Sequence, residues 1–297
     1  MSANSRSISN RSFRLLLRAG ARLRAMFRAM GGLSIPALAI LLAMALPLVP
    51  PVAAQTAREI MDKVNDRDDG DNQVSDLTMT LIDKNKKRRV RSIRSYSKDF
   101  GKDTYNILFF LSPADMKNTG FLTYDYDQAG KDDDQWLYLP ALRKTKRIAS
   151  SDKSGSFMGS DFNFSDMSEP DLDKYDFKLM KEPKVNGFPT WQIQSIPKSK
   201  EEAKDSGYSK SVLWVRKDIH MVIRSVRWVH KSRRLKYMQI VELEHIDGIW
   251  VAAKMKMTTK EGRKTVHTTW LQFDNIQFNQ GLKESMFTVR TLEKGVR

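Results

Sequence analysis

The stretch that decides the fold is Asp247-Gly248-Ile249-Trp250-Val251-Ala252-Ala253-Lys254-Met255-Lys256-Met257-Thr258. It opens with an aspartate-glycine pair, the dipeptide that favours a tight hairpin turn. Every second residue from Ile249 to Met257 is then apolar, whereas Lys254, Lys256 and Thr258 stand at alternate positions. Side chains alternate between the two faces of a strand, so this pattern predicts a strand with one buried and one solvated face.

Similar runs flank this strand on both sides. Four strand-like runs lie upstream and downstream of it, at residues 211–216, 221–230, 235–245 and 264–273. Turn residues join these runs at 217–218, 231–232 and 261–262. Earlier runs lie at residues 76–81, 86–96, 105–111 and 136–139. The pattern predicts an antiparallel meander of about ten strands, which must curl because a flat sheet of that size would expose its apolar face.

Two segments are candidates for covering the concave side of this sheet. Residues 57–64 have apolar positions at helical spacing, and Thr56 is a suitable N-cap, so one amphipathic helix is expected there. Residues 150–168 are rich in Ser, Asp and Gly yet contain five large apolar side chains: Phe157, Met158, Phe162, Phe164 and Met167. A disordered linker is not expected to carry so many. We interpret Phe157, Met158, Phe162 and Phe164 as a movable lid, with a passive cap on the core as the alternative.

The N-terminal segment has the layout of an export signal. Residues 1–54 contain seven arginines and no acid, an apolar run from 33 to 49, and the small residues Val52 and Ala54 before Gln55. The four prolines at 36, 47, 50 and 51 disfavour the alternative of an uncleaved membrane anchor. We predict a cleaved signal peptide over residues 1–54, a single domain over residues 55–297, and a location in the periplasm.

No stretch carries a recognised catalytic or metal-binding motif. The chain has no cysteine, and Gly155-Ser156-Phe157-Met158-Gly159 has phenylalanine where a nucleophile elbow needs serine. The aspartates of residues 66–71 do not match the spacing of a calcium loop, and the four histidines lie on separate predicted strands. We therefore predict no catalytic residue, no cofactor, no metal and no enzymatic activity.

The most basic strand runs over residues 86–94 and includes Arg88, Arg89 and Arg91. Several bases on one strand can contact anionic headgroups or an acidic partner, and we assign these three arginines to such a contact. The alternative is a charged edge that protects the sheet from aggregation. Nucleic acid is not expected as a partner, because the strand lacks interleaved stacking aromatics.

Several stretches resemble a known family. They are residues 135–144 (QWLYLPALRK), Arg147-Ile148, residues 155–162 (GSFMGSDF), residues 212–215 (VLWV) before Lys217-Asp218, Met221, Arg224, and Phe287-Thr288. This chain resembles the longer branch of the LolA-like superfamily of periplasmic outer-membrane lipoprotein-sorting proteins. The resemblance implies an unclosed antiparallel β-barrel, mainly β with helices, in which helices and a loop lid cover an apolar cavity for acyl chains.

The resemblance also suggests a cavity lining and a function. We expect the lipid cavity to be lined by Met79, Leu81, Trp136, Tyr138, Met255 and Met257. The alternative for each of the three methionines is an ordinary place in the core. A naked acyl chain costs about 0.8 kcal/mol per methylene in water, which an apolar lumen removes without chemistry. We therefore expect a monomeric, non-enzymatic carrier that takes a lipoprotein or lipid from an inner-membrane transporter toward an outer-membrane acceptor. The alternative is an accessory subunit docked on an efflux-type inner-membrane lipid transporter.

Overall fold

The computed structural model describes residues 55–295. The predicted signal peptide, residues 1–54, lies outside the described residues, so its cleavage remains a prediction. Among residues 55–295, no helix has the length and hydropathy needed to cross a membrane.

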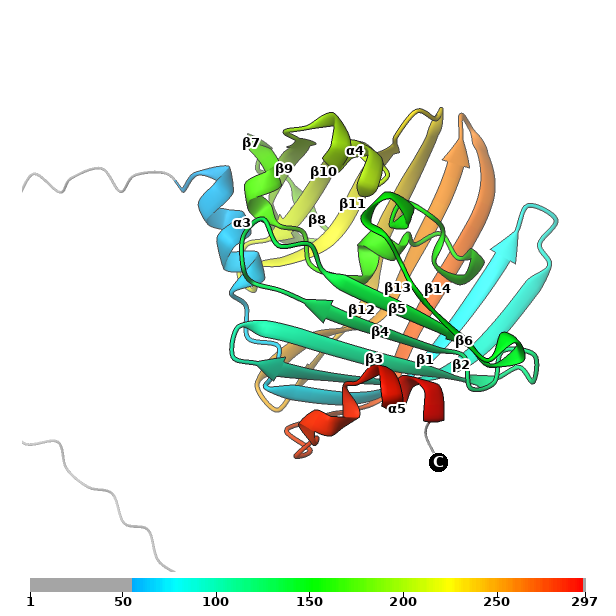
Figure 1. The fold of residues 1–297 in the computed structure, drawn as a ribbon. Coiled ribbons are helices and arrows are strands. Elements are labelled where there is room, and N and C mark those ends of the chain that lie inside the picture. The colour runs from blue at the N-terminus through cyan, green and yellow to red at the C-terminus, as the bar shows by residue number, and fades with distance from the viewer. Residues whose placement is uncertain (1–54, 296–297) are drawn as a thin grey trace, which may run out of the picture. The chain divides into compact units, whose positions relative to one another are not determined.

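Nearly all strands belong to one antiparallel sheet that curls into an open barrel (Figure 1). The first half contributes β1 (Asn72–Asp83), β2 (Arg88–Phe100), β3 (Asp103–Ser112), β4 (Gly120–Asp125), β5 (Asp134–Leu139) and β6 (Lys144–Arg147). The second half contributes β7 (Tyr175–Lys181), β9 (Phe188–Pro197), β10 (Tyr208–Arg216), β11 (Met221–Val229), β12 (Arg234–Ile246), β13 (Ile249–Glu261) and β14 (Lys264–Phe278). The short β8 (Lys184–Val185) pairs only with β9. The predicted fold class, mainly β with helices in an unclosed antiparallel barrel, is confirmed.

The opening of the barrel lies between two strands from the middle of the sequence, and not between the first and last strands. The strand order is β6-β5-β4-β3-β2-β1-β14-β13-β12-β11-β10-β9-β7, so β1 pairs with β14 and the two free edges are β6 and β7. In the pairing of β1 with β14, Leu77 lies opposite Phe273. The segment between β6 and β7 therefore has to bridge the gap. It contains four short 3₁₀ turns, at Ser150–Asp152, Phe157–Gly159, Phe164–Met167 and Leu172–Lys174.

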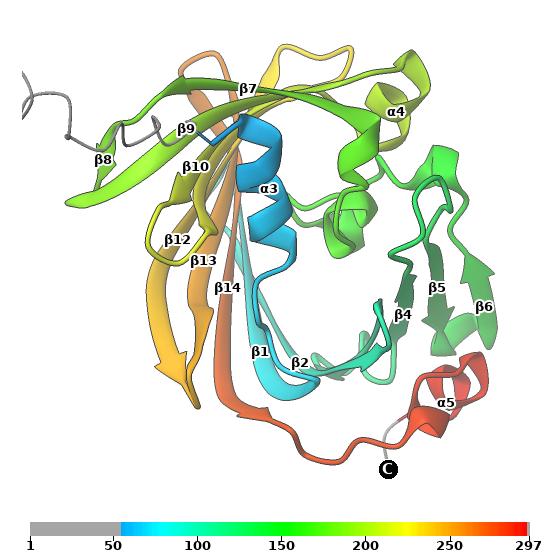
Figure 2. The same ribbon diagram turned by 90° about the vertical axis from the view of Figure 1, so that its left-hand side faces the viewer.

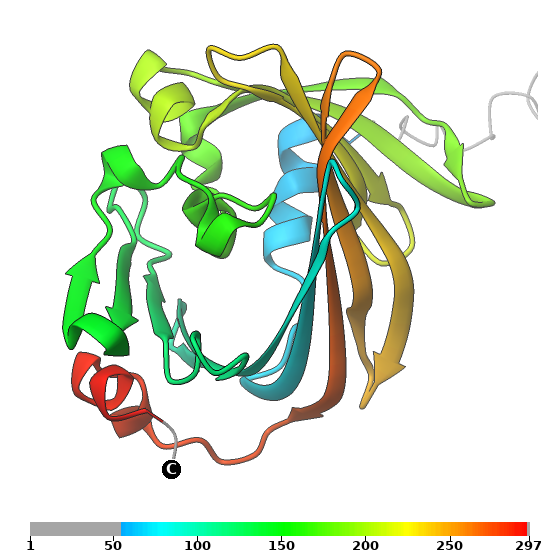
Figure 3. The same cartoon turned by 90° about the vertical axis from the view of Figure 1, so that its right-hand side faces the viewer.

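Helices close the two faces of the sheet at different places. The helix α3 (Ala57–Asn65) lies in the concavity and buries Ile60 and Met61 against Ile193 of β9 and Val215 of β10 (Figures 2 and 3). Its predicted N-cap is confirmed: Thr56 and Glu59 form a capping box. The C-terminal segment, with a 3₁₀ turn at Glu284–Met286 and α5 (Val289–Lys294), covers the convex side of β3 to β5. A further short helix, α4 (Lys200–Asp205), connects β9 to β10, and a 3₁₀ turn at Pro140–Leu142 connects β5 to β6.

The predicted hairpin turns are present where their residues demand them. Between β12 and β13, Asp247 and Gly248 have φ angles of 51° and 89°, the left-handed conformation that a two-residue hairpin turn requires. The strand after this turn keeps the predicted alternation, with Ile249, Ala253 and Met257 buried. Local turn chemistry and period-two patterning therefore account for the second half of the sheet.

Candidate functional site

The concave face of the sheet forms the largest apolar cluster. Its residues come from β1 to β5 and from β13 and β14 because every second side chain of each strand points inward. The cluster contains Leu77, Met79, Leu81, Ile93, Phe110, Phe121, Leu137, Met257 and Leu271, together with Ile148, Phe157 and Phe162 from the bridging segment. The interior is therefore completed by side chains that do not belong to the sheet.

Residues 155–164, which we call the plug, form a small hairpin inside this concavity. The Phe157 amide donates to the Phe162 carbonyl at 2.7 Å, and the Phe164 amide donates to the Gly155 carbonyl at 3.0 Å. At the tip of the plug, Met158 and Gly159 have φ angles of 49° and 72°. Phe157 is 1% exposed, and its ring lies 5.1 Å from that of Phe121. The plug thus inserts its aromatic side chains among the apolar side chains of the sheet.

A buried carboxylate holds the plug to β13 and β14. Asp161, whose side chain is 1% exposed, accepts hydrogen bonds from the hydroxyl of Thr259 and, at 2.7 Å, from that of Thr269. Its other contact is His267, whose Nδ1 lies 2.6 Å from Asp161 Oδ2. The backbone amide of Asp161 also donates to Thr269 at 2.9 Å. In this Asp161 network, all partners of the carboxylate serve to hold the plug in place. Both threonine hydroxyls donate to Asp161 and not to a histidine that could act as a base, so neither hydroxyl is activated as a nucleophile.

A second polar network holds the end of the plug to β10, β11 and β12. Lys236 Nζ donates to Asn163 Oδ1 at 2.6 Å, and the Tyr208 hydroxyl donates to Asp166 Oδ2 at 2.7 Å. Asp166 also forms an ion pair with Arg227. Burial lowers the pKa of Lys236 and raises the pKa of Tyr208. This Asp166 network is the more strongly charged of the two anchors.

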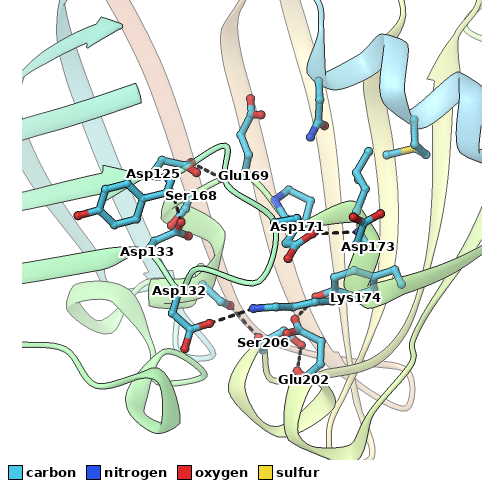
Figure 4. A pocket seen from close by; sticks show the side chains of 18 of the residues that line it. Asp125, Asp132, Asp133, Ser168, Glu169, Asp171, Asp173, Lys174, Glu202 and Ser206 are labelled. Carbon is cyan, nitrogen blue, oxygen red and sulfur yellow. Dashed lines mark hydrogen bonds and ion pairs between the residues drawn. The ribbon is translucent and has the colours of Figure 1, made fainter. Parts of the chain in front are cut away.

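An open cavity of about 1010 Å³ lies beside the plug, between α3, the β4–β5 connection and the segment before β7 (Figure 4). Its lining is mainly polar, and acidic residues outnumber basic ones. Burial, followed by nearby carboxylates, raises the pKa of Asp125 to about 8 and that of Glu169 to about 7. The Asp125 carboxylate accepts a hydrogen bond from the Glu169 amide at 2.6 Å. The apolar interior predicted from the sequence is present, but the plug fills it, and the open space next to it is polar.

The structure brings together four of the six predicted cavity residues. Met79, Leu81 and Met257 are buried in the interior cluster, and the half-buried Met255 packs against it. Trp136 and Tyr138 lie elsewhere: they pack on the convex face with Phe287, beneath the C-terminal segment. The reason is the alternation along β5, where Leu137 and Leu139 take the inward positions instead.

All four predicted lid residues contact the interior cluster. Phe157 and Phe162 are buried in it, and Met158 and Phe164 pack against it while partly exposed. They therefore occupy the lumen itself, and their movement as a lid stays a prediction.

The three predicted contact arginines are separated. Arg88 and Arg89 are exposed, whereas Arg91 is 8% exposed and faces the interior opposite Met79. Arg91 donates to the carbonyl oxygen of Met158 at 2.5 Å, and burial lowers its pKa. The alternation along β2 therefore gives Arg91 a contact with the plug tip instead of with an external surface.

The polar anchors of the plug were missed from the sequence. A signal was available, because Lys236, Thr259, His267 and Thr269 occupy inward positions of strands whose other inward residues are apolar. Polar residues at such positions indicate that a polar segment docks there, but the pattern does not identify Asp161 as the partner. Within residues 55–295, no group of three or more His, Asp or Glu side chains could hold a metal ion.

Comparison with known proteins assigns the class and the family. A family model described as "Uncharacterized protein" matches residues 102–294. No curated protein matches the chain significantly. Among solved structures, a LolA superfamily protein from Nitrosomonas europaea matches with a TM-score of 0.60 at 15% identity, covering 80% of this chain and 100% of that one. The fold is therefore that of the LolA-like superfamily.

Two further solved structures are similar enough in sequence to define the family. A DUF1329 family protein from Desulfovibrio piger is 32% identical with a TM-score of 0.72, and the match covers 80% of this chain and 97% of that one. A putative outer membrane lipoprotein-sorting protein domain from Vibrio parahaemolyticus is also 32% identical with a TM-score of 0.72, covering 80% of this chain and 98% of that one. The chain belongs to the DUF1329 family.

Proposed function

We propose that this protein is a non-enzymatic periplasmic carrier of lipidated cargo, a lipid or a lipoprotein, whose acyl chains occupy the interior now filled by the plug. The observation that carries the proposal is the plug itself: an irregular segment supplies Phe157 and Phe162 to an interior that the sheet alone leaves incomplete. The relative from Vibrio parahaemolyticus, described as a putative lipoprotein-sorting domain, supports the same role.

The energetics allow an acyl chain to replace the plug. Burying one phenylalanine contributes about 1.5–3 kcal/mol, so withdrawing Phe157 and Phe162 costs about 3–6 kcal/mol. Releasing Asp161 from its three partners adds about 4.5–9 kcal/mol, since each bond to a charged group contributes about 1.5–3 kcal/mol net. An acyl chain with a dozen buried methylenes returns on the order of 10 kcal/mol at about 0.8 kcal/mol each. These terms nearly balance, which is what a carrier needs in order both to load and to release cargo.

The proposal can be tested by fastening the plug to the sheet. The chain has no cysteine, so an introduced pair can form only one intramolecular disulfide. Asp161 and Thr269 are suitable positions, because their side-chain oxygens lie 2.7 Å apart. The variant carrying Asp161→Cys and Thr269→Cys should bind a fluorescent fatty acid when reduced and bind it at least tenfold more weakly when oxidised.

The matched control places the disulfide within the sheet alone. Thr258 and Thr268 face each other across β13 and β14, with hydroxyl oxygens 3.2 Å apart. The variant carrying Thr258→Cys and Thr268→Cys should bind the fatty acid equally in both redox states. If the oxidised plug variant, with its disulfide verified by mass, binds as well as the reduced one, the interior is not the cargo site. Absence of acyl binding in every form would favour the accessory-subunit alternative.

A further inference from the structure

Three hairpin turns project from the same end of their strands. Together they form what we call the basic edge: residues 83–89, 231–234 and 260–264. The strand register places them side by side, because Asp83 lies opposite His267, His267 opposite Thr259, and Thr259 opposite Lys236. Figure 1 shows the turns of β1–β2, β11–β12 and β13–β14 extending toward the same side of the molecule.

The basic edge holds eleven Lys and Arg residues against two acids, a net charge of +9. Residues 55–297 carry 44 bases and 35 acids, so the basic edge accounts for a charge equal to the whole excess of that region. Ten of the eleven bases are exposed. Of these eleven bases, only Arg234 forms an ion pair with another of the described residues, with Glu261 at 3.1 Å. The carboxylate of Asp83 instead accepts hydrogen bonds from the backbone amides of Asn85 and Lys87.

The connections at the opposite ends of the strands are acidic. They are the link between α3 and β1, residues 66–71, and the β4–β5 connection, residues 126–133, which line or adjoin the polar cavity. The two signs of charge are therefore separated along the strands. In the field of an anionic surface such a molecule orients with the basic edge toward that surface.

We propose that the basic edge docks on the anionic phospholipid surface of a bilayer. This deepens the proposed carrier function by naming the surface at which cargo would be exchanged. Three features favour lipid over an acidic protein: the bases are spread over three separate turns, they are long side chains with little internal pairing, and Val90, 50% exposed, adjoins them on β2. Each base close to an anionic leaflet strengthens binding about fivefold.

Docking by this edge would place the plug next to the bilayer. His267, which contacts Asp161, lies only three residues along β14 from Lys264 at the turn. At about 3.3 Å per residue, this separation is about 10 Å. An acyl chain leaving the interior near Asp161 would thus have a short path to the membrane.

The test measures co-flotation of the full chain with vesicles of phosphatidylcholine alone or with 30% phosphatidylglycerol, at about 50 and about 500 mM salt. One variant carries Lys86→Glu and Lys87→Glu, and a second carries Arg233→Glu and Arg263→Glu. The control carries Lys181→Glu and Lys184→Glu, two exposed residues on β7 and β8 away from the basic edge, with the same change in net charge. All variants keep residues 1–54, so the contribution of that segment is common to all.

Wild type should float with anionic vesicles at low salt only, and each basic-edge variant should bind at least 25-fold more weakly, with an unchanged melting temperature. The control should lose less than threefold. Equal loss in the control, equal binding to neutral vesicles, or unchanged binding of the basic-edge variants would overturn the proposal. Association with an acidic membrane protein but not with anionic vesicles would do so as well. Fatty-acid binding should stay the same in all variants, so a failure here is distinguishable from a failure of the carrier function.

Discussion

Replacing Phe157 with alanine tests whether the plug and an acyl chain compete for the same interior. Phe157 is 1% exposed, and its ring makes edge contacts with Phe121 at 5.1 Å and with Phe164 at 5.6 Å. Truncating a buried phenylalanine costs about 3–5 kcal/mol. Because the lost contacts exist only when the plug is seated, the substitution should raise the free energy of the seated state and leave the open state nearly unchanged.

The predicted effect on cargo binding follows from that difference. A destabilisation of about 3 kcal/mol changes an equilibrium about 100-fold. The apparent affinity for an acyl chain should rise by up to this factor, until the open state predominates. Phe157→Ala is therefore expected to bind lipid more tightly than wild type, although it removes an apolar group from the interior.

Two measurements check the prediction: titration with a fluorescent fatty acid, and hydrogen exchange of the plug amides. The amides of Phe157, Ser160 and Phe164 are bonded within the plug and should exchange faster in the variant, while those of β13 and β14 should not. The matched control is Phe109→Ala, equally buried but in the convex cluster. It should lower the melting temperature by about 6–20 °C without tightening lipid binding. A fatty-acid affinity that is unchanged or weaker in Phe157→Ala would refute the reasoning and make Phe157 part of the permanent core.

The cavity carboxyls should make stability depend on pH. Their pKa values are raised, to about 8 for Asp125 and about 7 for Glu169, so between pH 5 and these values the folded protein holds protons that the unfolded chain has released. The free energy of unfolding should therefore fall as pH rises from 6 to 8, by about 1 kcal/mol per pH unit for one such group. Urea unfolding at several pH values should show this fall, and Asp125→Asn should make the dependence on pH flatter. A free energy of unfolding that increases with pH would contradict the prediction. Arg91→Met should accelerate hydrogen exchange at the plug tip, because it removes the donor to the Met158 carbonyl; unchanged exchange would mean that this bond is dispensable. Leu292→Ala, at a fully buried position in the convex cluster, should cost about 2–5 kcal/mol of stability. Its fatty-acid affinity should stay at the wild-type value, and any shift would implicate the convex face in binding.

The fold was predictable from the sequence because its determinants are local. The alternation after Asp247-Gly248 and the capping residue Thr56 specify a strand and a helix start through contacts with near neighbours in the chain. The position of the opening was not predictable in this way. It depends on the pairing of β1 with β14, in which Leu77 lies opposite Phe273, and no local pattern encodes a contact between residues so far apart.

The parts of the site that depend on amino-acid composition were predictable from the sequence. The parts that depend on which face of a strand a side chain occupies were not. The apolar content of the plug indicated a segment that enters the interior, as Phe157 and Phe162 do. On β5, however, Trp136 and Leu137 are both apolar, so hydropathy could not tell which one faces inward. On β2 the charge of Arg91 suggested exposure, but its inward phase and the carbonyl of Met158 make burial possible.

The two anchors of the plug differ in charge, and the difference determines how the plug would open under the proposed function. At Asp161 the partners are two threonine hydroxyls and His267, and a released carboxylate regains its bonds from water. At Asp166 the partners are the Tyr208 hydroxyl and the guanidinium of Arg227 on β11, and opening this anchor would leave the largely buried Arg227 without its counter-charge, which costs about 3–5 kcal/mol in addition to the lost hydrogen bonds. The Asp161 anchor lies beside the buried phenylalanines, and the Asp166 anchor lies at the start of the segment that leads to β7. The plug should therefore release at Asp161 and stay attached at Asp166, which lets the same hairpin return to its place once the acyl chain has left.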